Sequence, residues 1–325
     1  MRRLPITEAP HPAGSDLERL PTARLLARLH AGDREAARAV GRALGPLTAL
    51  VDAAARALRE GGRLVYAGAG TSGRLGALDA AECPPTFGVD PSRVVALVAG
   101  GPAALRRSVE GAEDDRAAGA AAVRRARVGE GDLLVGISAS GRTPFVVAAL
   151  AEGRRRGART ALLTSDPAAR ARVDHRVVLD TGPERIAGST RMKAGTAAKM
   201  ALSLLSTSAF VRLGAVREGR MIALRPVSEK LRGRAVRNVQ ILAGVSATVA
   251  RRLLDHAGWD VRSAIDAGLL GDEEAGAEAG PFDSALPPPR QRYAQGERSR
   301  GPSHPSKSKS KSRSGSGSGS SRGHR

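Results

Sequence analysis

Residues 64–76 read LVYAGAGTSGRLG, an apolar run followed by a turn that is rich in glycine and hydroxyl groups. The run at 64–67 predicts a buried parallel strand, and the turn after it predicts a helix from about residue 73 to 83. Further apolar runs alternate with helical segments along the chain, at residues 93–98, 132–138, 159–164 and 176–179. This alternation indicates an α/β protein with a doubly wound parallel sheet.

The turn after the first strand predicts an anion site. Free N–H groups at the start of a helix attract phosphate, while Thr71 and Ser72 add hydroxyl donors and Gly73 permits close approach of the backbone. Glu82 lies near the far end of the same helix, which the prolines at 84 and 85 are expected to stop. One helix therefore joins a phosphate cradle to a carboxylate.

The same turn also fits a dinucleotide-binding pattern, because Gly68, Gly70 and Gly73 have the spacing GxGxxG. A nicotinamide site needs an acidic residue about twenty positions further on, at the end of the second strand, to hold the ribose hydroxyls. Residues 96–101 read ALVAGG and contain no acid. Phosphate binding is therefore favoured over dinucleotide binding, and a dehydrogenase is kept only as a distant alternative.

The composition limits the class of protein. Aromatic residues make up 2% of the 325 positions, so the core must be built from Ala, Leu and Val. The formal net charge is +20, but residues 290–325 hold ten Lys or Arg and one acid, which argues against a nucleic-acid surface on the fold itself. Cys83 is the single cysteine, and no apolar leader or membrane-length run is found. We expect a cytoplasmic protein without disulfides, metal ligands or membrane spans.

The chain divides into four predicted parts. Residues 1–45 form an arm with one helix at 21–29, and residues 46–220 form the α/β body, which ends in a long apolar helix at 191–213. Residues 221–268 are a small helical piece with a break at 244–246, where Ser246 is placed to cap the next helix. Residues 269–325 are rich in Ser, Gly, Pro and basic residues, which predicts disorder. An RNA-binding segment and an extension without function are the alternatives for this tail.

A second predicted phosphate turn follows the strand at 132–138. Residues 138–144 read SASGRTP, so Ser138, Ser140 and Thr143 can all point at one anion, and Pro144 suits the first position of a helix. A single serine here would be explained as a helix cap. Three hydroxyls at one strand end favour a phosphate site, since ligands of open α/β sheets bind beyond the carboxyl ends of the strands.

Two further clusters have both a structural and a functional interpretation. Residues 108–116 are acidic and include Glu113, which is either part of a solvated helix start or, if it turns inward toward Glu82, half of an acid–base pair. Residues 188–196 place Ser189 and Lys193 at the start of the long apolar helix. Cations are unfavourable at the positive end of a helix, which favours a ligand or an inter-subunit contact there.

Together these segments resemble the N-acetylmuramic acid 6-phosphate etherases, members of the sugar isomerase (SIS) superfamily, which also includes the glucokinase regulatory protein. The resemblance covers about residues 6–265. The matching stretches are GAGTSGRLG at 68–76, DAAECPPT at 79–86, VEGAED at 109–114, SASGRTP at 138–144 and GSTRMKAGTA at 188–197.

The resemblance implies an SIS-type, flavodoxin-like fold and a homodimer that needs no cofactor. It implies cleavage of the lactyl ether of N-acetylmuramic acid 6-phosphate to N-acetylglucosamine 6-phosphate and D-lactate, in the recycling of cell-wall amino sugars. Glu82 matches the proton donor to lactate, and Glu113 matches the second carboxylate, assigned as the base. The family's sugar-phosphate site is matched by Ser72, Ser138, Ser140 and Thr143, and the sequence pattern adds Thr71, Gly73, Ser189 and Lys193 as candidate substrate-binding residues.

The chain departs from the family pattern at several positions. It has His11 where Asn is usual and Arg185 where an aliphatic residue is usual, which puts the arm and fine substrate contacts in question. Past Ile265 the resemblance ends, although family members continue with another apolar helical stretch, so reduced stability is expected. The alternative function is a non-catalytic sugar-phosphate-binding regulator of the same superfamily. Retention of Glu82 and Glu113, and a single α/β body, favour the enzyme.

Overall fold

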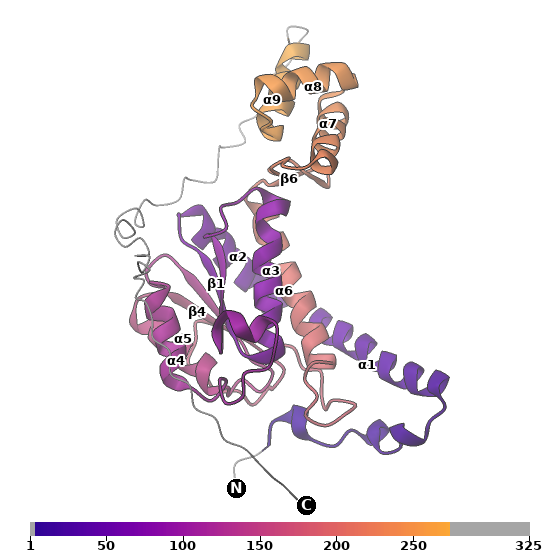
Figure 1. The fold of residues 1–325 in the computed structure, drawn as a ribbon, viewed down its shortest axis with the longest axis vertical. Helices are drawn as coiled ribbons and strands as arrows, with labels where there is room; N and C mark the ends of the chain where they lie inside the picture. The colour runs from indigo at the N-terminus through magenta and orange to yellow at the C-terminus, as the bar shows by residue number, and fades with distance from the viewer. Residues whose placement is uncertain (1–3, 274–325) are drawn as a thin grey trace, which may run out of the picture. The chain divides into compact units, whose positions relative to one another are not determined.

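A computed structural model describes residues 4–273 of the chain. A five-stranded parallel sheet with the order β2-β1-β3-β4-β5 forms its centre (Figure 1). The strands are β1 (Leu64–Gly68), β2 (Val94–Val98), β3 (Leu133–Ile137), β4 (Arg159–Thr164) and β5 (His175–Val178). All five lie within one residue or so of the predicted runs, and the doubly wound, flavodoxin-like sheet is confirmed.

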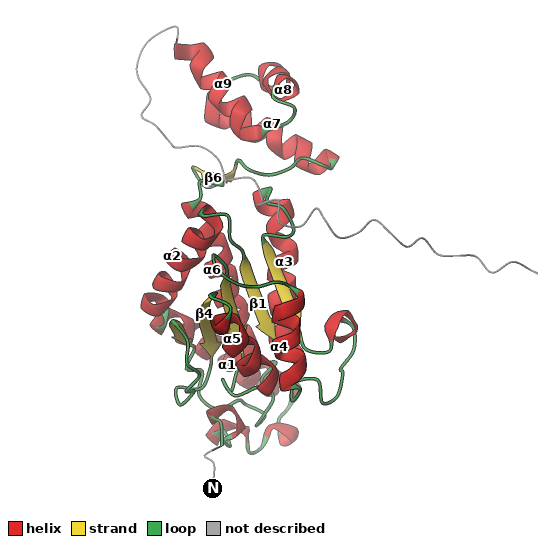
Figure 2. Cartoon of the chain, turned by 90° about the vertical axis from the view of Figure 1, so that its left-hand side faces the viewer, coloured by secondary structure: helices red, strands yellow, loops and turns green. Residues whose placement is uncertain are grey.

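Helices cover both faces of this sheet (Figure 2). One face packs against α1 (Thr22–Arg42), α2 (Leu44–Arg59), α3 (Gly70–Phe87) and α6 (Lys193–Arg212). The other face packs against α4 (Arg116–Arg125) and α5 (Pro144–Arg155). Because side chains alternate along a strand, Tyr66 of β1 enters the first core and Val65 the second.

The expectation that the two prolines would stop α3 is wrong. The helix passes through Pro84 and Pro85 and ends at Phe87, where Gly88 adopts φ +66° and its N–H bonds to the carbonyl of Pro84 at 2.9 Å. A left-handed glycine just after the last turn is a strong helix end. The tertiary packing of Cys83 and Phe87 in the core, together with this cap, outweighs the two missing N–H donors.

The N-terminal arm is more helical than predicted. Three short 3-10 turns, at Ile6–Glu8, Pro12–Gly14 and Leu17–Arg19, lead into α1, which extends to Arg42 rather than ending near residue 29. The second half of α1 is held by tertiary packing, since Ala36 and Val40 lie in the core beneath it. The arm contacts the loop before α6, where the N–H of Gly188 bonds to the carbonyl of Thr7 at 2.9 Å.

A helical unit follows the sheet. A short hairpin that the sequence analysis did not predict, β6 (Val216–Arg217) with β7 (Arg220–Met221), leads into α7 (Glu229–Ala243), α8 (Ala247–His256) and α9 (Val261–Glu273). These helices share a core of their own. The predicted break and the Ser246 cap are confirmed, because Ser246 Oγ accepts from the N–H of Val249 at 3.3 Å.

The predicted boundaries between the four parts of the chain, at residues 45, 220 and 268, stay a prediction. Within the described residues, α9 continues to Glu273, and Ile241 and Leu270 are exposed apolar side chains on the helical unit. The remainder of the predicted tail, residues 274–325, lies outside the described residues. No helix in the range 4–273 is both long and apolar enough to span a membrane.

Candidate active site

The two predicted phosphate turns meet at one edge of the sheet. One turn follows β1 and the other follows β3, and these neighbouring strands are where the strand order reverses. Open α/β sheets bind ligands at such a switch point, beyond the carboxyl ends of the strands. The third cluster also lies here, because Ser72, Ala139 and Thr190 all line one small cavity of about 10 Å³.

The three hydroxyls after β3 come together as expected. Ser138 Oγ lies 2.8 Å from Thr143 Oγ1 and 3.4 Å from Ser140 Oγ, and Ser138 is buried. Ser140 Oγ also accepts from the N–H of Arg142 at 3.2 Å. Pro144 occupies the first turn of α5, as expected, so the hydroxyls lie at the N-terminal end of this helix.

The turn after β1 is held tightly against its strand. A Cβ added at Gly73 would lie 2.7 Å from the carbonyl oxygen of Gly68, so only glycine allows α3 to start this close to β1. Thr71 and Ser72 are half-buried in the first turn of α3. The Thr71 methyl group also lies against the first turn of α6 at Gly195. These contacts bring the predicted cradle residues of α3 and α6 together.

Glu82 is not beside the cradle in its own chain. It lies on α3 ten residues beyond Ser72, and at 1.5 Å of rise per residue the two are roughly 15 Å apart along the helix axis. Its side chain is exposed, as are those of Leu78 and Pro85 on the same face. The structure therefore separates the predicted acid from the predicted phosphate site within one chain.

A buried polar network beneath Glu82 was missed by the sequence analysis. Asp79 accepts hydrogen bonds from the Tyr66 hydroxyl at 2.7 Å and from Ser206 Oγ at 3.0 Å. Burial raises the pKa of Asp79, although both hydrogen bonds oppose the rise. The network ties α3 to β1 and α6, so it fixes the helix face that carries Glu82. No local sequence signal could have shown it, because Asp79 and Ser206 are 127 positions apart.

Glu113 lies next to the second turn. Its backbone carbonyl accepts from the N–H of Phe145 at 2.9 Å, which places it against the start of α5, while its side chain is exposed. The neighbouring Asp115 is a helix cap, since its side chain accepts from the N–H of Ala118 at 2.8 Å. Among the described residues no hydrogen bond or ion pair joins Glu113 to Glu82, so the expectation that they form a pair stays a prediction.

The start of α6 has its own internal anion. Glu184 is fully buried, and its carboxylate accepts from the N–H groups of Lys193 and Ala194 at 3.0 and 2.9 Å. Burial raises the pKa of Glu184, against the effect of these bonds and the Lys193 charge. The unfavourable cations at this helix start, which had favoured a ligand or a partner subunit, are thus offset inside the chain. Ser189 is half-buried in the loop before the helix.

Lys193 belongs to an ionic cluster that the sequence analysis did not foresee. Its ammonium donates to Glu35 Oε2 at 2.6 Å and to the carbonyl of Pro183 at 2.9 Å, and its side chain is 3% exposed. Arg185 pairs with the same carboxylate and lies 3.2 Å from His11 Nδ1. His11 and Arg185, which both differ from the family pattern, are therefore in contact. The role of Lys193 in substrate binding stays a prediction.

The thiol of Cys83 is not a nucleophile. Burial, with the Asp79 charge adding to it, raises the pKa of this thiol to about 12, so it stays protonated near neutral pH. Its Sγ donates to the carbonyl of Asp79 at 3.1 Å. Across residues 4–273, no three His, Cys, Asp or Glu side chains are grouped closely enough to hold a metal ion.

Comparisons with known proteins identify the family of this chain. Residues 47–153 match the glucokinase regulatory protein N-terminal SIS domain. An N-acetylmuramic acid 6-phosphate etherase of Deinococcus radiodurans is 48% identical, with 80% of this chain and 86% of the relative covered. The chain belongs to the N-acetylmuramic acid 6-phosphate etherase family. An etherase of Salmonella choleraesuis is 43% identical, with 84% of this chain and 92% of the relative covered.

Membership of the etherase family settles the class of protein. The expectation of an enzyme is confirmed, and these relatives support it over the regulator. A solved structure of a putative phosphosugar isomerase involved in capsule formation, from Bacteroides fragilis, is also similar. It is 20% identical with a TM-score of 0.44, and the match covers 57% of this chain and 90% of that one.

Proposed function

We propose that this etherase-family chain cleaves the D-lactyl ether of N-acetylmuramic acid 6-phosphate, with Glu82 and Glu113 as its acid and base. The observation that carries the proposal is the meeting of Ser138, Ser140 and Thr143 at the switch point, next to Glu113. Hydroxyls and helix N–H groups suit the phosphate group of the sugar. With the phosphate held there, the sugar carbons would lie near Glu113, which is next to the hydroxyls.

The chemistry needs one base and one acid. In the open-chain sugar the C1 aldehyde acidifies the C2 proton, which the Glu113 carboxylate removes. Electrons move into a C2–C3 double bond, the C3–O bond breaks, and the carboxylic acid of Glu82 protonates the departing lactate oxygen. Water then adds at C3 and a proton returns to C2, which leaves N-acetylglucosamine 6-phosphate. Acid and base groups with different environments can divide these duties.

The position of Glu82 supports a homodimer with shared sites. The cradle and the acid are separated along α3 in one chain, while Glu82 and Leu78 lie on an exposed helix face. In a two-fold dimer, a residue that is exposed on one subunit can complete the site of the other. Leu204 and Val211 of α6, also exposed, extend the apolar surface available for such contact.

The cellular setting is part of the same proposal. The proposed substrate, a phosphorylated amino sugar with a lactyl ether, is chemically related to bacterial cell-wall sugars. We therefore assign the enzyme to cytoplasmic recycling of cell-wall amino sugars. The composition of the folded part, with one cysteine and no predicted span, supports this location.

The proposal is tested by incubating the purified chain with N-acetylmuramic acid 6-phosphate in deuterated water. Lactate release and deuterium entry at C2 are followed for the parent and for Glu82→Gln and Glu113→Gln. Loss of a positioned acid or base should slow lactate release roughly 100-fold or more. Exchange that survives in Glu82→Gln but not in Glu113→Gln supports Glu113 as the base.

Glu110→Gln is the matched control, because Glu110 is an exposed acid in the same segment and, among the described residues, its side chain bonds only to Ser108, at 3.0 Å. It should release lactate at the parent rate. A folded parent that binds the sugar phosphate yet releases no lactate would overturn the catalytic proposal in favour of a sugar-phosphate sensor.

A further inference from the structure

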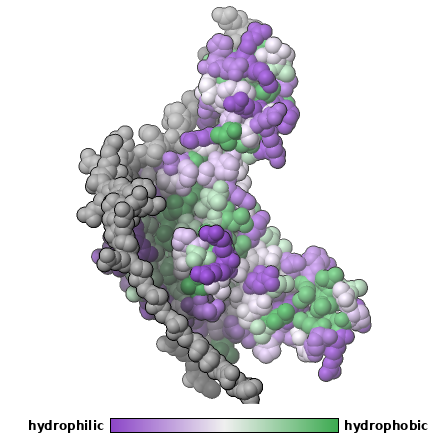
Figure 3. Space-filling model, viewed as in Figure 1, coloured by the Kyte–Doolittle hydropathy of each residue, from purple (hydrophilic) through white to green (hydrophobic). Residues whose placement is uncertain are grey.

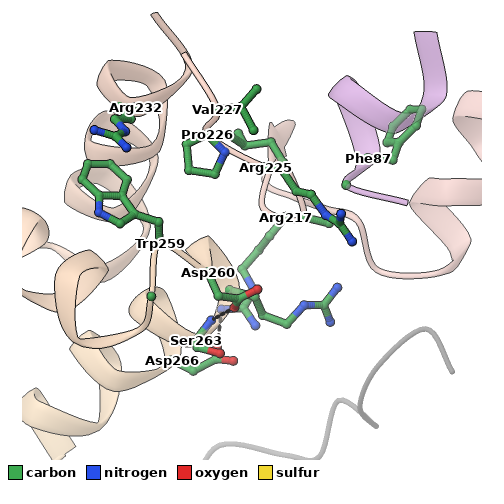
Figure 4. Close-up of a pocket in the computed structure, with 15 residues that line it drawn as sticks. Phe87, Arg217, Arg225, Pro226, Val227, Arg232, Trp259, Asp260, Ser263 and Asp266 are labelled. Carbon is green, nitrogen blue, oxygen red and sulfur yellow. Dashed lines mark hydrogen bonds and ion pairs between the residues drawn. The ribbon is translucent and has the colours of Figure 1, made fainter. Parts of the chain in front are cut away.

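A second pocket lies at the other end of α3, away from the phosphate turns (Figure 4). It has a volume of about 930 Å³ and is lined by the end of α3, the segment 223–227 and residues 258–266 at the start of α9. Gly88 is sixteen residues past Ser72, which is roughly 24 Å along the helix. The pocket is therefore distinct from the candidate active site of the same chain, and its size suits a small metabolite.

The lining of this pocket is positively charged. It contains four arginines, Arg217, Arg225, Arg232 and Arg262, and two acids. Both acids are already engaged, since Asp260 accepts from the N–H of Ser263 at 2.7 Å and Asp266 pairs with Arg217 at 3.2 Å. The pocket therefore has two positive charges in excess, which matches the charge of a phosphate monoester near neutral pH.

One of these arginines has unused hydrogen-bond donors. Within residues 4–273, Arg225 makes no hydrogen bond and no ion pair, although its charge interacts with the nearby Asp90 carboxylate, and its side chain is exposed at the pocket. Arg262 uses one N–H to bond to the carbonyl of Gly214 at 2.7 Å and keeps further donors. A guanidinium presents several N–H groups in a fixed fork, which suits the oxygens of a phosphate group.

An aromatic residue also lines the pocket. Trp259 is half-buried in the wall, and Arg232 lies over its ring at 5.0 Å from the centroid. The backbone of Trp259 has φ +64°, which is unusual for a bulky residue and is held by the bond from its N–H to the carbonyl of Leu254 at 2.7 Å. Figure 4 shows Trp259 and Arg232 on one side of the pocket and Arg217 and Arg225 on the other.

From these contacts we infer that this pocket is a second ligand site, which binds a phosphate monoester through Arg225 and Arg262 with its organic body beside Trp259. The inference does not depend on the proposed etherase chemistry, because it rests on residues at the opposite edge of the sheet. A phosphorylated small molecule bound there would report on metabolite supply without entering the active site.

The chain carries its own probe for this site. Trp259 is the single tryptophan of the sequence, so its fluorescence reports directly on the pocket. Inorganic phosphate and N-acetylglucosamine 6-phosphate are titrated into the full chain at constant ionic strength, with sodium chloride and sodium acetate as comparisons. We expect a saturable change in Trp259 emission with both phosphates, at lower concentration for the sugar phosphate, and none with chloride or acetate.

Arg225→Gln tests the assignment, and Arg251→Gln, an exposed arginine of α8 outside the pocket, is its matched control. Loss of a charged hydrogen bond should raise the dissociation constant roughly 10- to 100-fold in Arg225→Gln. Arg251→Gln should match the parent. Lactate release without added phosphate should be unchanged in both variants.

Three results would overturn the inference: no saturable change in the parent, an equal change with chloride, or the same titration curve for the two variants. A Ser138→Ala chain separates this site from the active site. If the emission change disappears in Ser138→Ala but persists in Arg225→Gln, phosphate binds at the catalytic turns and the second site is refuted.

Discussion

At the residue scale, Glu35 neutralises two cations that have little contact with water. Arg185 and Lys193 are 8% and 3% exposed, and both pair with this single carboxylate. Glu35→Gln would remove the only carboxylate that forms ion pairs with both cations in the described residues, and Glu184, which accepts from backbone N–H groups, would remain as the anion near Lys193 alone. We expect the free energy of unfolding to fall by about 3 kcal/mol, measured by urea denaturation.

Two further variants make this prediction specific. Glu18→Gln removes an exposed carboxylate of the arm and should change stability by less than about 0.5 kcal/mol. Arg185→Val restores the kind of residue that the family pattern has and removes a guanidinium whose buried Nε has no hydrogen-bond partner in the part of the chain that the structure describes. Arg185→Val should lower the free energy of unfolding much less than Glu35→Gln does, because the ion pair between Lys193 and Glu35 stays intact. Equal losses in the two variants would show that the cluster does not depend on charge balance.

The same ionic cluster predicts that the stability of the folded chain depends on pH, because His11 belongs to it. Burial lowers the pKa of His11 below 6.5, and the charges of Arg185 and Lys193 lower it further, while Glu35 opposes them. The unfolded chain therefore binds a proton more readily than the folded chain as the pH falls below 6.5. Acid should destabilise the parent over this range.

His11→Asn removes the titrating group and should flatten that slope. The check is the difference in melting temperature between about pH 7.5 and 5.5, for the parent and for the variant. The titration of Glu35 lies below this range, because the pKa of its carboxyl is lowered below 4.5. Burial alone would raise this pKa, but the Lys193 hydrogen bond and the nearby cations outweigh that effect. A parent that loses no more stability than His11→Asn would contradict the prediction.

At the element scale, α3 is fixed by side chains as well as by its packing. Tyr66→Phe removes one of the two hydroxyl donors to the buried Asp79 carboxylate. The unfolding free energy should fall by about 2 kcal/mol, since a buried charged acceptor loses its partner. Lactate release should slow as well, because α3 carries Glu82 one turn further on.

Ser206→Ala tests the same network from α6, and a double-mutant cycle with Tyr66→Phe should show coupling of about 1 kcal/mol. Ser208→Ala is the matched control, because no hydrogen bond involves its side chain in the described residues. A Tyr66→Phe chain that melts and reacts like Ser208→Ala would show that packing alone positions the helix.

The sequence predicted the elements whose signals are local. A strand such as 133–137 and the turn that follows it are encoded in about ten adjacent residues, so both the strand and the meeting of its hydroxyls could be predicted. The length of α1 could not be predicted in this way. Its second half is stabilised by packing on α6, which lies far away in the sequence. The Glu35 and Asp79 clusters join residues more than 120 positions apart, and only the fold brings them together.

At the scale of the whole molecule, the question is whether one chain contains a complete active site. Hydroxyls, helix N–H groups and Glu113 lie at one end of α3, and Glu82 lies on an exposed face further along it. Figure 3 also shows apolar surface over the part of α1 that stands away from the sheet in Figure 1, where Leu26 is 61% exposed. Both features suit a dimer in which each site takes Glu82 from the other subunit.

Hybrid dimers test this arrangement directly. A chain with Glu82→Gln and a chain with Ser138→Ala and Thr143→Val should each be inactive alone. If the site is shared, mixing and re-pairing them places both defects in one site of a hybrid and leaves its other site intact, so about one quarter of the parent activity should return. If each chain holds a complete site, every site keeps one defect and no activity returns.

The control is the same mixing of Glu82→Gln with Glu113→Gln. In the shared arrangement their defects lie on opposite sides of the site, so this pair should also recover activity, whereas Glu113→Gln mixed with the Ser138 and Thr143 variant should not.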